Sequence, residues 1–263
     1  MKKIFLSLVL FIGIFESYAQ EAANDRKIRK EEKRQRINAI VRQEEEGVLT
    51  YKKQLAFGFK LTTDGYGGFL EVARAQSVRR TMLFQLDIAE RKHMKEEKLQ
   101  NDLSPTAPLI YGKINYFYPV KLGVQQQFNF GNKGNKNGVS LTGNFGGGFI
   151  LGLLRPYQVQ VQKDNGEYAF VGYNSPDSNY FLNGPFLGGP DLGTGWGNLQ
   201  VMPGMYAKSS LRFDYGKYNE MINAIEIGVV AEYYTKKIPQ MIYINQKQYF
   251  LSAYVSLIFG RRK

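Results

Sequence analysis

The chain has one histidine and no cysteine among its 263 residues, which limits the chemistry that its side chains can perform. A hydrolase of the Ser–His type needs a histidine beside an activated serine. His93 lies instead in a charged stretch with no serine motif or paired acid. A single histidine without cysteine also makes a transition-metal site improbable. We therefore predict no catalytic residue, no metal and no other cofactor, with His93 as an ordinary loop residue.

Basic residues gather in two segments that we expect to be exposed loops, one around His93 at 91–98 and one at 236–237. Such clusters suit the phosphates of lipopolysaccharide or another surface polyanion. Lysine-rich loops also serve solubility alone, and the sequence leaves both interpretations open. The candidate polyanion-binding residues are Arg91, Lys92, Lys95, Lys98, Lys236 and Lys237.

A second set of charges alternates with apolar residues along segments of period two. In a barrel of eight strands such positions point into the lumen, which is just wide enough for side chains to fill it. Because unpaired buried charges are costly, we expect these residues to pair as a packed polar core. A narrow ion path is the functional alternative. The predicted lumen charge network is Glu71, Asp87, Lys113, Lys121, Arg212, Asp214, Glu226 and Glu232.

The elements that position these charges are segments in which apolar and polar residues alternate. In 221–234, for example, Ile225, Ile227 and Val229 alternate with Glu226 and Gly228. Alternation over roughly ten residues is typical of membrane-barrel strands. A soluble all-β protein is the main rival, but we would expect more polar residues on its outer face. We predict an all-β, antiparallel, up-and-down transmembrane β-barrel of about eight strands, at 54–63, 68–76, 81–90, 109–128, 139–153, 206–215, 221–234 and 248–259.

Loop lengths support this count independently, because outer-membrane barrels have short periplasmic turns and longer external loops. With the N-terminus in the periplasm, the inner turns are 77–80, 129–138 and 216–220, and the longer outer connections are 91–108, 154–205 and 235–247. The 154–205 stretch is a long external loop or hairpin. Its segment 184–198 combines glycines with the only tryptophan, which suggests a recognition or packing loop. Pro119 predicts a bulge or bend in the fourth strand.

The N-terminal fifth of the chain differs from the rest. Lys2 and Lys3, the apolar run 4–15, and small residues at 17 and 19 predict a cleavable signal peptide at 1–19. The run is shorter than the about 20 residues that a spanning helix needs. Residues 20–50 mix both charge signs without proline and with Gly47 as the only glycine, and predict a charged periplasmic helix or tail. The barrel then occupies 51–263.

Composition agrees with an exported barrel. Eighteen Tyr, eighteen Phe and 28 Gly suit aromatic girdles, strands and tight turns, and a mean hydropathy of −0.35 argues against a helical membrane protein. The net charge of +12 favours anionic partners. In the cell envelope we expect outer-membrane lipid or lipopolysaccharide, together with envelope proteins that contact the N-terminal helix, rather than nucleic acid.

Most of the chain after 1–19 resembles the outer-membrane β-barrel proteins of Bacteroidetes-type bacteria. The residues that carry the likeness are 83–85 with 92–96, 153–157, 225–229 with 236–239, and 259–262. A looser likeness is to the PorT-like group associated with type IX secretion. The resemblance implies an outer-membrane location and a barrel fold, and it supplies no catalytic residues.

We therefore expect a non-enzymatic barrel of structural or interaction type, in an envelope secretion or surface-assembly system. A small transport channel is the first alternative, and it would need extra strands from 154–205. A lipid-modifying barrel enzyme is the second, and the missing Ser–His signature disfavours it.

Overall fold

The computed structural model describes residues 27–35, 39, 52–99, 108–131, 138–191, 193–216 and 220–263. The chain divides into two units, 1–50 and 51–263. In the first unit, 27–35 form a helix whose side chains are exposed. The predicted signal peptide lies outside the described residues, and so does the rest of the predicted charged segment apart from Ala39. None of the helices that the structure describes is long and apolar enough to cross a membrane.

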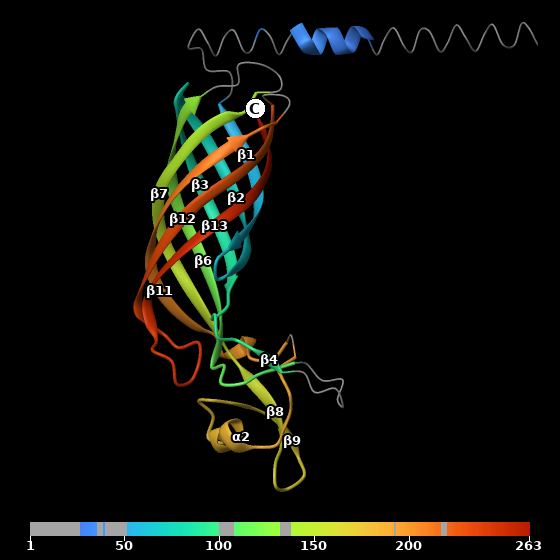
Figure 1. Cartoon of the computed structure of the whole chain (residues 1–263), viewed down its shortest axis with the longest axis vertical. Coiled ribbons are helices and arrows are strands. Elements are labelled where there is room, and N and C mark those ends of the chain that lie inside the picture. Colours follow the sequence, from blue (N-terminus) through green and yellow to red (C-terminus); the bar gives the residue numbers. More distant parts are fainter. Residues whose placement is uncertain are drawn as a thin grey trace, which may run out of the picture. The chain divides into compact units, whose positions relative to one another are not determined.

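Eight strands of the second unit close into an antiparallel barrel (Figure 1). Around the ring the order is β1-β13-β12-β11-β7-β6-β3-β2, so each barrel strand pairs with the barrel strands before and after it in sequence. The predicted up-and-down barrel of eight strands is thereby confirmed. The strands are β1 (Lys53–Thr62), β2 (Gly65–Ser77), β3 (Arg80–Arg91), β6 (Asn115–Gly131), β7 (Ser140–Pro156), β11 (Gln200–Asp214), β12 (Met221–Ile238) and β13 (Lys247–Arg262).

Side chains alternate between the lumen and the outer surface along most of the barrel strands, as the period of two requires. On β1, Phe59 is 66% exposed and Leu61 is 70% exposed, whereas Lys60 between them is 4% exposed. The same alternation runs along β12 and β13. The barrel therefore presents apolar residues on its outside and encloses polar and charged residues.

The two ends of the barrel differ as the loop lengths predicted. Short connections join β2 to β3, β6 to β7 and β11 to β12 at the end where β13 finishes. The long connections leave the opposite end (Figure 1). Of the predicted bulge or bend at Pro119, the bulge is not found. Pro119 pairs with Gly152 in an unbroken register between β6 and β7, and the pairing of β6 with β3 is interrupted between Phe117 and Val120. A proline removes one ladder hydrogen bond, which in this strand does not shift the register.

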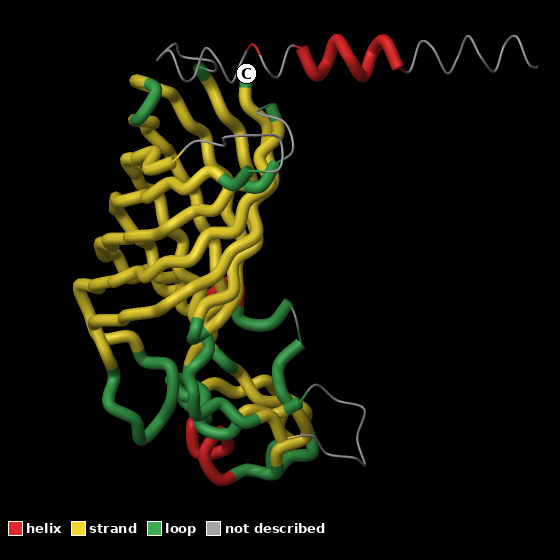
Figure 2. Tube along the Cα trace, turned by 45° about the horizontal axis from the view of Figure 1, so that its top comes forward, coloured by secondary structure: helices red, strands yellow, loops and turns green. Residues whose placement is uncertain are grey.

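The long connections fold together into a small lobe beyond the barrel (Figure 2). Its main sheet has the order β10-β8-β9, and β4 pairs with β5 in a second, two-stranded sheet. A hydrophobic cluster that includes Tyr157, Val161 and Phe181 forms its core. The ends of the 154–205 stretch lengthen β7 to Pro156 and β11 from Gln200, while the part between them forms a hairpin outside the ring and adds no new strand to the barrel. The elements are β4 (Lys98–Leu99), β5 (Leu109–Ile110), β8 (Gln158–Gln162), β9 (Tyr168–Gly172), α2 (Ser178–Asn183), β10 (Phe186–Gly188) and the 3-10 helix η1 (Trp196–Asn198).

Candidate functional site

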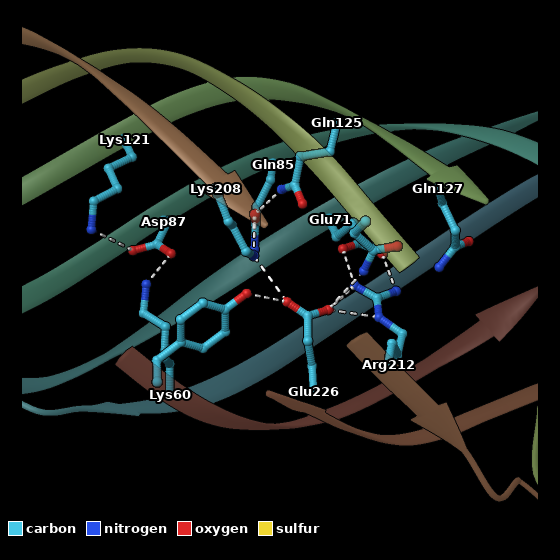
Figure 3. Close-up of polar contacts among 12 residues, drawn as sticks. Lys60, Glu71, Gln85, Asp87, Lys121, Gln125, Gln127, Lys208, Arg212 and Glu226 are labelled. Atoms are coloured by element: carbon cyan, nitrogen blue, oxygen red, sulfur yellow. Dashed lines mark hydrogen bonds and ion pairs between the residues drawn. The ribbon is translucent and has the colours of Figure 1, made fainter. Parts of the chain in front are cut away.

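Charged side chains fill the middle of the lumen and pair across it (Figure 3). Arg212 from β11 makes a bidentate contact with Glu71 from β2, with Nη1–Oε1 and Nη2–Oε2 distances of 2.9 and 2.7 Å. Its Nε donates to Glu226 Oε2 at 2.8 Å. All three residues are at most 2% exposed, and one guanidinium thus contacts two buried carboxylates.

Glu226 collects further donors around its other oxygen. Lys208 Nζ lies 3.0 Å from Glu226 Oε1, and the Tyr254 hydroxyl donates to the same oxygen at 2.6 Å. The Asn144 amide donates to Oε2 at 3.0 Å. Lys208 also reaches Gln85, which accepts a hydrogen bond from Gln125. A buried carboxylate with this many donors is held in its charged form and in one position.

A second cluster lies between these residues and the lobe. Asp87 pairs with Lys60 and lies 3.8 Å from Lys121. Lys121 Nζ is 2.9 Å from Glu232 Oε1, and Arg91 Nη1 is 2.7 Å from Glu232 Oε2. The chain of ion pairs thus runs from strand to strand around the lumen wall.

All eight predicted lumen residues are buried. Seven lie on barrel strands. Lys113 does not: it lies in the connection between β5 and β6, where its Nζ is 2.6 Å from Glu96 Oε2. Burial lowers the pKa of Lys113, although Glu96 opposes the shift. The correction follows from β6 starting at Asn115, so 109–114 cross to the lobe instead of continuing the strand.

Several lumen charges were missing from the predicted network, although the period of two places them there. Lys60 alternates with Phe59 and Leu61, and Lys208 has the same parity as Arg212. The unpredicted members that make ion pairs are Asp64, Arg91, Lys60, Lys208 and Arg262.

Two apolar clusters also lie in the lumen, beside the charged residues. Towards the lobe, a buried cluster contains Phe117, Leu154 and Tyr234. At the opposite end, another contains Phe69 and Ile258. Buried apolar side chains and paired polar side chains therefore share the described lumen, and the ion pair between Arg262 and Asp214 lies at the short-turn end.

The candidate polyanion-binding residues do not form one surface. Arg91 is only 5% exposed, and its Nε lies 2.6 Å from Asp64 Oδ2 within the lumen network. Its assignment to an exposed loop is therefore wrong. The physical reason is that β3 runs one residue past the predicted end at Glu90, and Arg91 falls on the inward face. Lys92 is half-buried, and the exposed members are Lys95, Lys98, Lys236 and Lys237.

His93 takes part in a local turn. Its Nδ1 accepts a hydrogen bond from the Lys95 backbone N–H at 3.2 Å, and its own N–H donates to Glu96 at 2.9 Å. Burial lowers its pKa, and nearby Lys247 contributes to the shift while Glu96 opposes it. Within the described ranges, no group of three His, Asp or Glu side chains is placed to hold a metal ion.

The glycine-rich stretch with the tryptophan packs against the barrel end. Trp196 stacks on Tyr118 with ring centroids 5.7 Å apart. The Arg155 guanidinium lies 5.0 Å from the Trp196 ring and 4.2 Å from the Tyr116 ring. Of the two roles predicted for this segment, the structure provides contacts for packing, since these rings join the lobe to β6 and β7.

A scan against protein-family models and a search of curated proteins find no match for the sequence. Among solved structures, the chain is similar to the N-terminal β-barrel domain of OprF from Pseudomonas aeruginosa, with 9% identity, 80% of this chain and 98% of that chain covered, and a TM-score of 0.36. It is similar to the Neisserial surface protein A, with 11% identity, coverage of 80% and 96%, and a TM-score of 0.36. It is also similar to Ail of Yersinia pestis, with 10% identity, coverage of 81% and 99%, and a TM-score of 0.38. At these scores the likenesses say nothing about function.

Proposed function

We propose that the chain is an outer-membrane β-barrel with a sealed lumen, which acts as a structural or interaction protein of the cell envelope. The outer surface supports the membrane location. Side chains such as Phe59, Leu122, Phe149 and Leu251 are more than 60% exposed on barrel strands that come from different parts of the chain. In water an apolar surface of this extent would drive aggregation, whereas a lipid-facing barrel requires it.

The orientation follows from the two ends of the barrel. Outer-membrane barrels keep short turns in the periplasm and longer loops outside. The short-turn end also holds the paired ends of β1 and β13, where Gln54 lies opposite Arg262. We therefore place this end in the periplasm and the lobe outside the cell.

One observation carries the choice of a sealed barrel over a channel. The buried lumen charges form ion pairs with one another inside a ring of eight strands, whose interior is just wide enough for side chains to fill it. A channel of wider bore would need additional strands. The 154–205 stretch, which was the candidate source, adds no strand to the ring, and its middle part belongs to the lobe.

We also propose that the protein is not an enzyme. The lumen acids are held by cations, and His93 is engaged in a turn. The lobe supports an interaction role, because a folded region with its own hydrophobic core presents a fixed surface that a partner can bind. The predicted roles in secretion or surface assembly, the Bacteroidetes-type origin and a partner for the charged N-terminal segment belong to this proposal.

Single cysteines test location and orientation together, because the chain has none of its own. Glu167→Cys places a thiol at the exposed β8–β9 turn of the lobe, and Arg79→Cys places one at the exposed β2–β3 turn. A membrane-impermeant maleimide, added to intact cells, should label the thiol at 167 and spare the thiol at 79 until the outer membrane is permeabilised. Both variants should then be recovered in the outer-membrane fraction. Equal labelling of both, or recovery in the soluble fraction, would contradict the proposal.

A further inference from the structure

A pocket of about 200 Å³ lies at the lobe-side rim of the barrel; we call it the rim pocket. It lies between the β1–β2 turn, the β3–β4 connection and the β12–β13 connection. The last of these is fixed by backbone hydrogen bonds, since Gln240 O accepts from Ile114 and the Ile242 N–H donates to Gly112, both at 2.8 Å. The pocket walls are therefore tied to neighbouring backbone.

The polar wall of the rim pocket is rich in donors. Lys92 and Lys247 line it, and neither makes an ion pair within the part of the chain that the structure describes. Gln240 lines it too, is 6% exposed, and its Nε2 has no hydrogen-bond partner among the described residues. A buried amide donor without a partner costs free energy, so an acceptor placed there would be stabilising. These groups suit an anion with several oxygen acceptors.

One acceptor completes the polar wall. Asp64 lines the rim pocket, and its Oδ2 is already engaged by Arg91 at 2.6 Å and by the Ser252 hydroxyl at 2.9 Å. Its buried Oδ1 has no partner among the described residues. A hydroxyl beside the anionic group would donate to this oxygen. The polar wall thus fits a phosphate next to a hydroxyl, as in phosphorylated glycerol or sugar.

The remaining wall is apolar and continues onto the outside of the barrel. Tyr249 and Leu251 line the rim pocket, and they are 56% and 66% exposed on the outward face of β13. That face continues through Val255 and Leu257. The volume is below the roughly 300–1,000 Å³ of ordinary ligand sites. It has room for a headgroup, while an attached acyl chain would lie along β13.

We infer that the rim pocket binds the phosphorylated glycerol or sugar headgroup of a lipid, with its acyl chain against Tyr249 and Leu251. The inference rests on the proposed membrane location. It also distinguishes the lysines that line the pocket from the lysines that lie outside it at this end of the barrel. Lys92 and Lys247 line the pocket, whereas Lys236 and Lys237 are exposed and do not.

Binding to the folded protein in detergent tests this assignment. The probe is 1-palmitoyl lysophosphatidic acid, which carries a phosphate monoester, one hydroxyl and one acyl chain, and binding is read by native mass spectrometry. The test variant is Lys92→Gln with Lys247→Gln, and its matched control is Lys236→Gln with Lys237→Gln. Since the test variant loses two charged contacts to the phosphate, it should bind at least about tenfold more weakly. The control should stay within about twofold of the wild type.

Two reference ligands identify the source of the phosphate. Monopalmitoylglycerol lacks the phosphate and should bind at least about tenfold more weakly than the probe, by the same charged contacts. Inorganic phosphate lacks the acyl chain and should displace the probe only at far higher concentration. Gln240→Leu should also weaken binding, because it removes the free donor.

Three results would overturn the inference: equal binding by the two double variants, equal affinity for inorganic phosphate and for the probe, or no saturable binding to a wild-type barrel that migrates as folded in unheated gels. Recovery of the protein outside the outer membrane would contradict the proposed function, and the detergent measurement is independent of that result.

Discussion

Within the barrel, Lys60 is 4% exposed and Phe59 beside it is 66% exposed, whereas in the lobe Val161 is fully buried and Gln162 beside it faces outward. Both arrangements follow from the alternation of a strand. They differ in the side that is apolar: the lobe hides apolar side chains in its core, whereas the barrel exposes them, towards lipid in the proposed membrane location, and keeps its charges inside. One chain of 263 residues thus uses two opposite rules of burial, separated by the rim of the barrel.

The largest expected effect lies in the lumen. Arg212→Met should destabilise the barrel by about 3–5 kcal/mol, because it leaves Glu71 and Glu226 buried without their guanidinium. Urea unfolding in lipid vesicles measures the change. The combination Glu71→Gln with Arg212→Met should recover part of the loss, since Glu71 is then neutral and Glu226 keeps Lys208 as its cation. A single substitution that leaves the stability unchanged would mean that these ion pairs do not hold the lumen together.

A matched pair of arginine substitutions compares the two outer surfaces directly. Phe59→Arg on β1 should cost about 2–4 kcal/mol if that face meets lipid near the bilayer midplane. Phe170→Arg in the lobe, where the side chain is 39% exposed, should stay within about 0.5 kcal/mol. Unfolding in vesicles and protease resistance of the lobe report the two effects. Similar small effects at both positions would indicate that the barrel face meets water.

The lobe has its own weak point at Tyr157, whose hydroxyl accepts a hydrogen bond from the Ile110 N–H at 2.7 Å. Tyr157→Phe leaves that buried donor without its partner and should destabilise the lobe by about 1–3 kcal/mol. Limited proteolysis should cut the lobe faster while the barrel stays folded in unheated gels. If barrel and lobe lose stability together, they do not behave as separate regions.

The smallest effect concerns the connection that carries Lys113. Burial lowers its pKa below the ordinary value of 10.5, so the folded form binds this proton less readily than the unfolded form. The free-energy cost of burying the protonated lysine is complete at pH values below the lowered pKa, and it disappears as the pH rises towards 10.5. Protease resistance of the connection should therefore rise with pH in this window, relative to Lys113→Met, in which the dependence should vanish. A dependence that persists in Lys113→Met would assign it to another group.

The sequence was sufficient for the barrel because its signal is local and repeated. Each strand shows the alternation by itself, and parity then assigns residues such as Asp87 and Glu232 to the lumen. The same rule failed at strand ends: extending β3 by one residue moves Arg91 from a loop into the lumen. The same alternation places Lys60 and Lys208 in the lumen, so the sequence alone could have included them in the predicted charge network.

The lobe and the rim pocket depend on contacts between distant segments, which no local pattern encodes. The lobe core joins Ile110 to Phe181 and Val171. The rim pocket brings Lys92 together with Gln240 and Lys247, which lie about 150 residues further along the chain. Lys247 and Gln240 belong to no sequence motif, so only the fold assigns them to the rim pocket.

Conductance in planar bilayers tests the central claim of a sealed lumen most directly. The wild-type protein, reconstituted after its folded state is verified in unheated gels, should give no steady ionic current at applied voltages at which the bilayer itself is stable. A reproducible single-channel conductance that changes its ion selectivity when Glu226 or Lys121 is neutralised would contradict the account, because it would make the lumen charges the lining of a path.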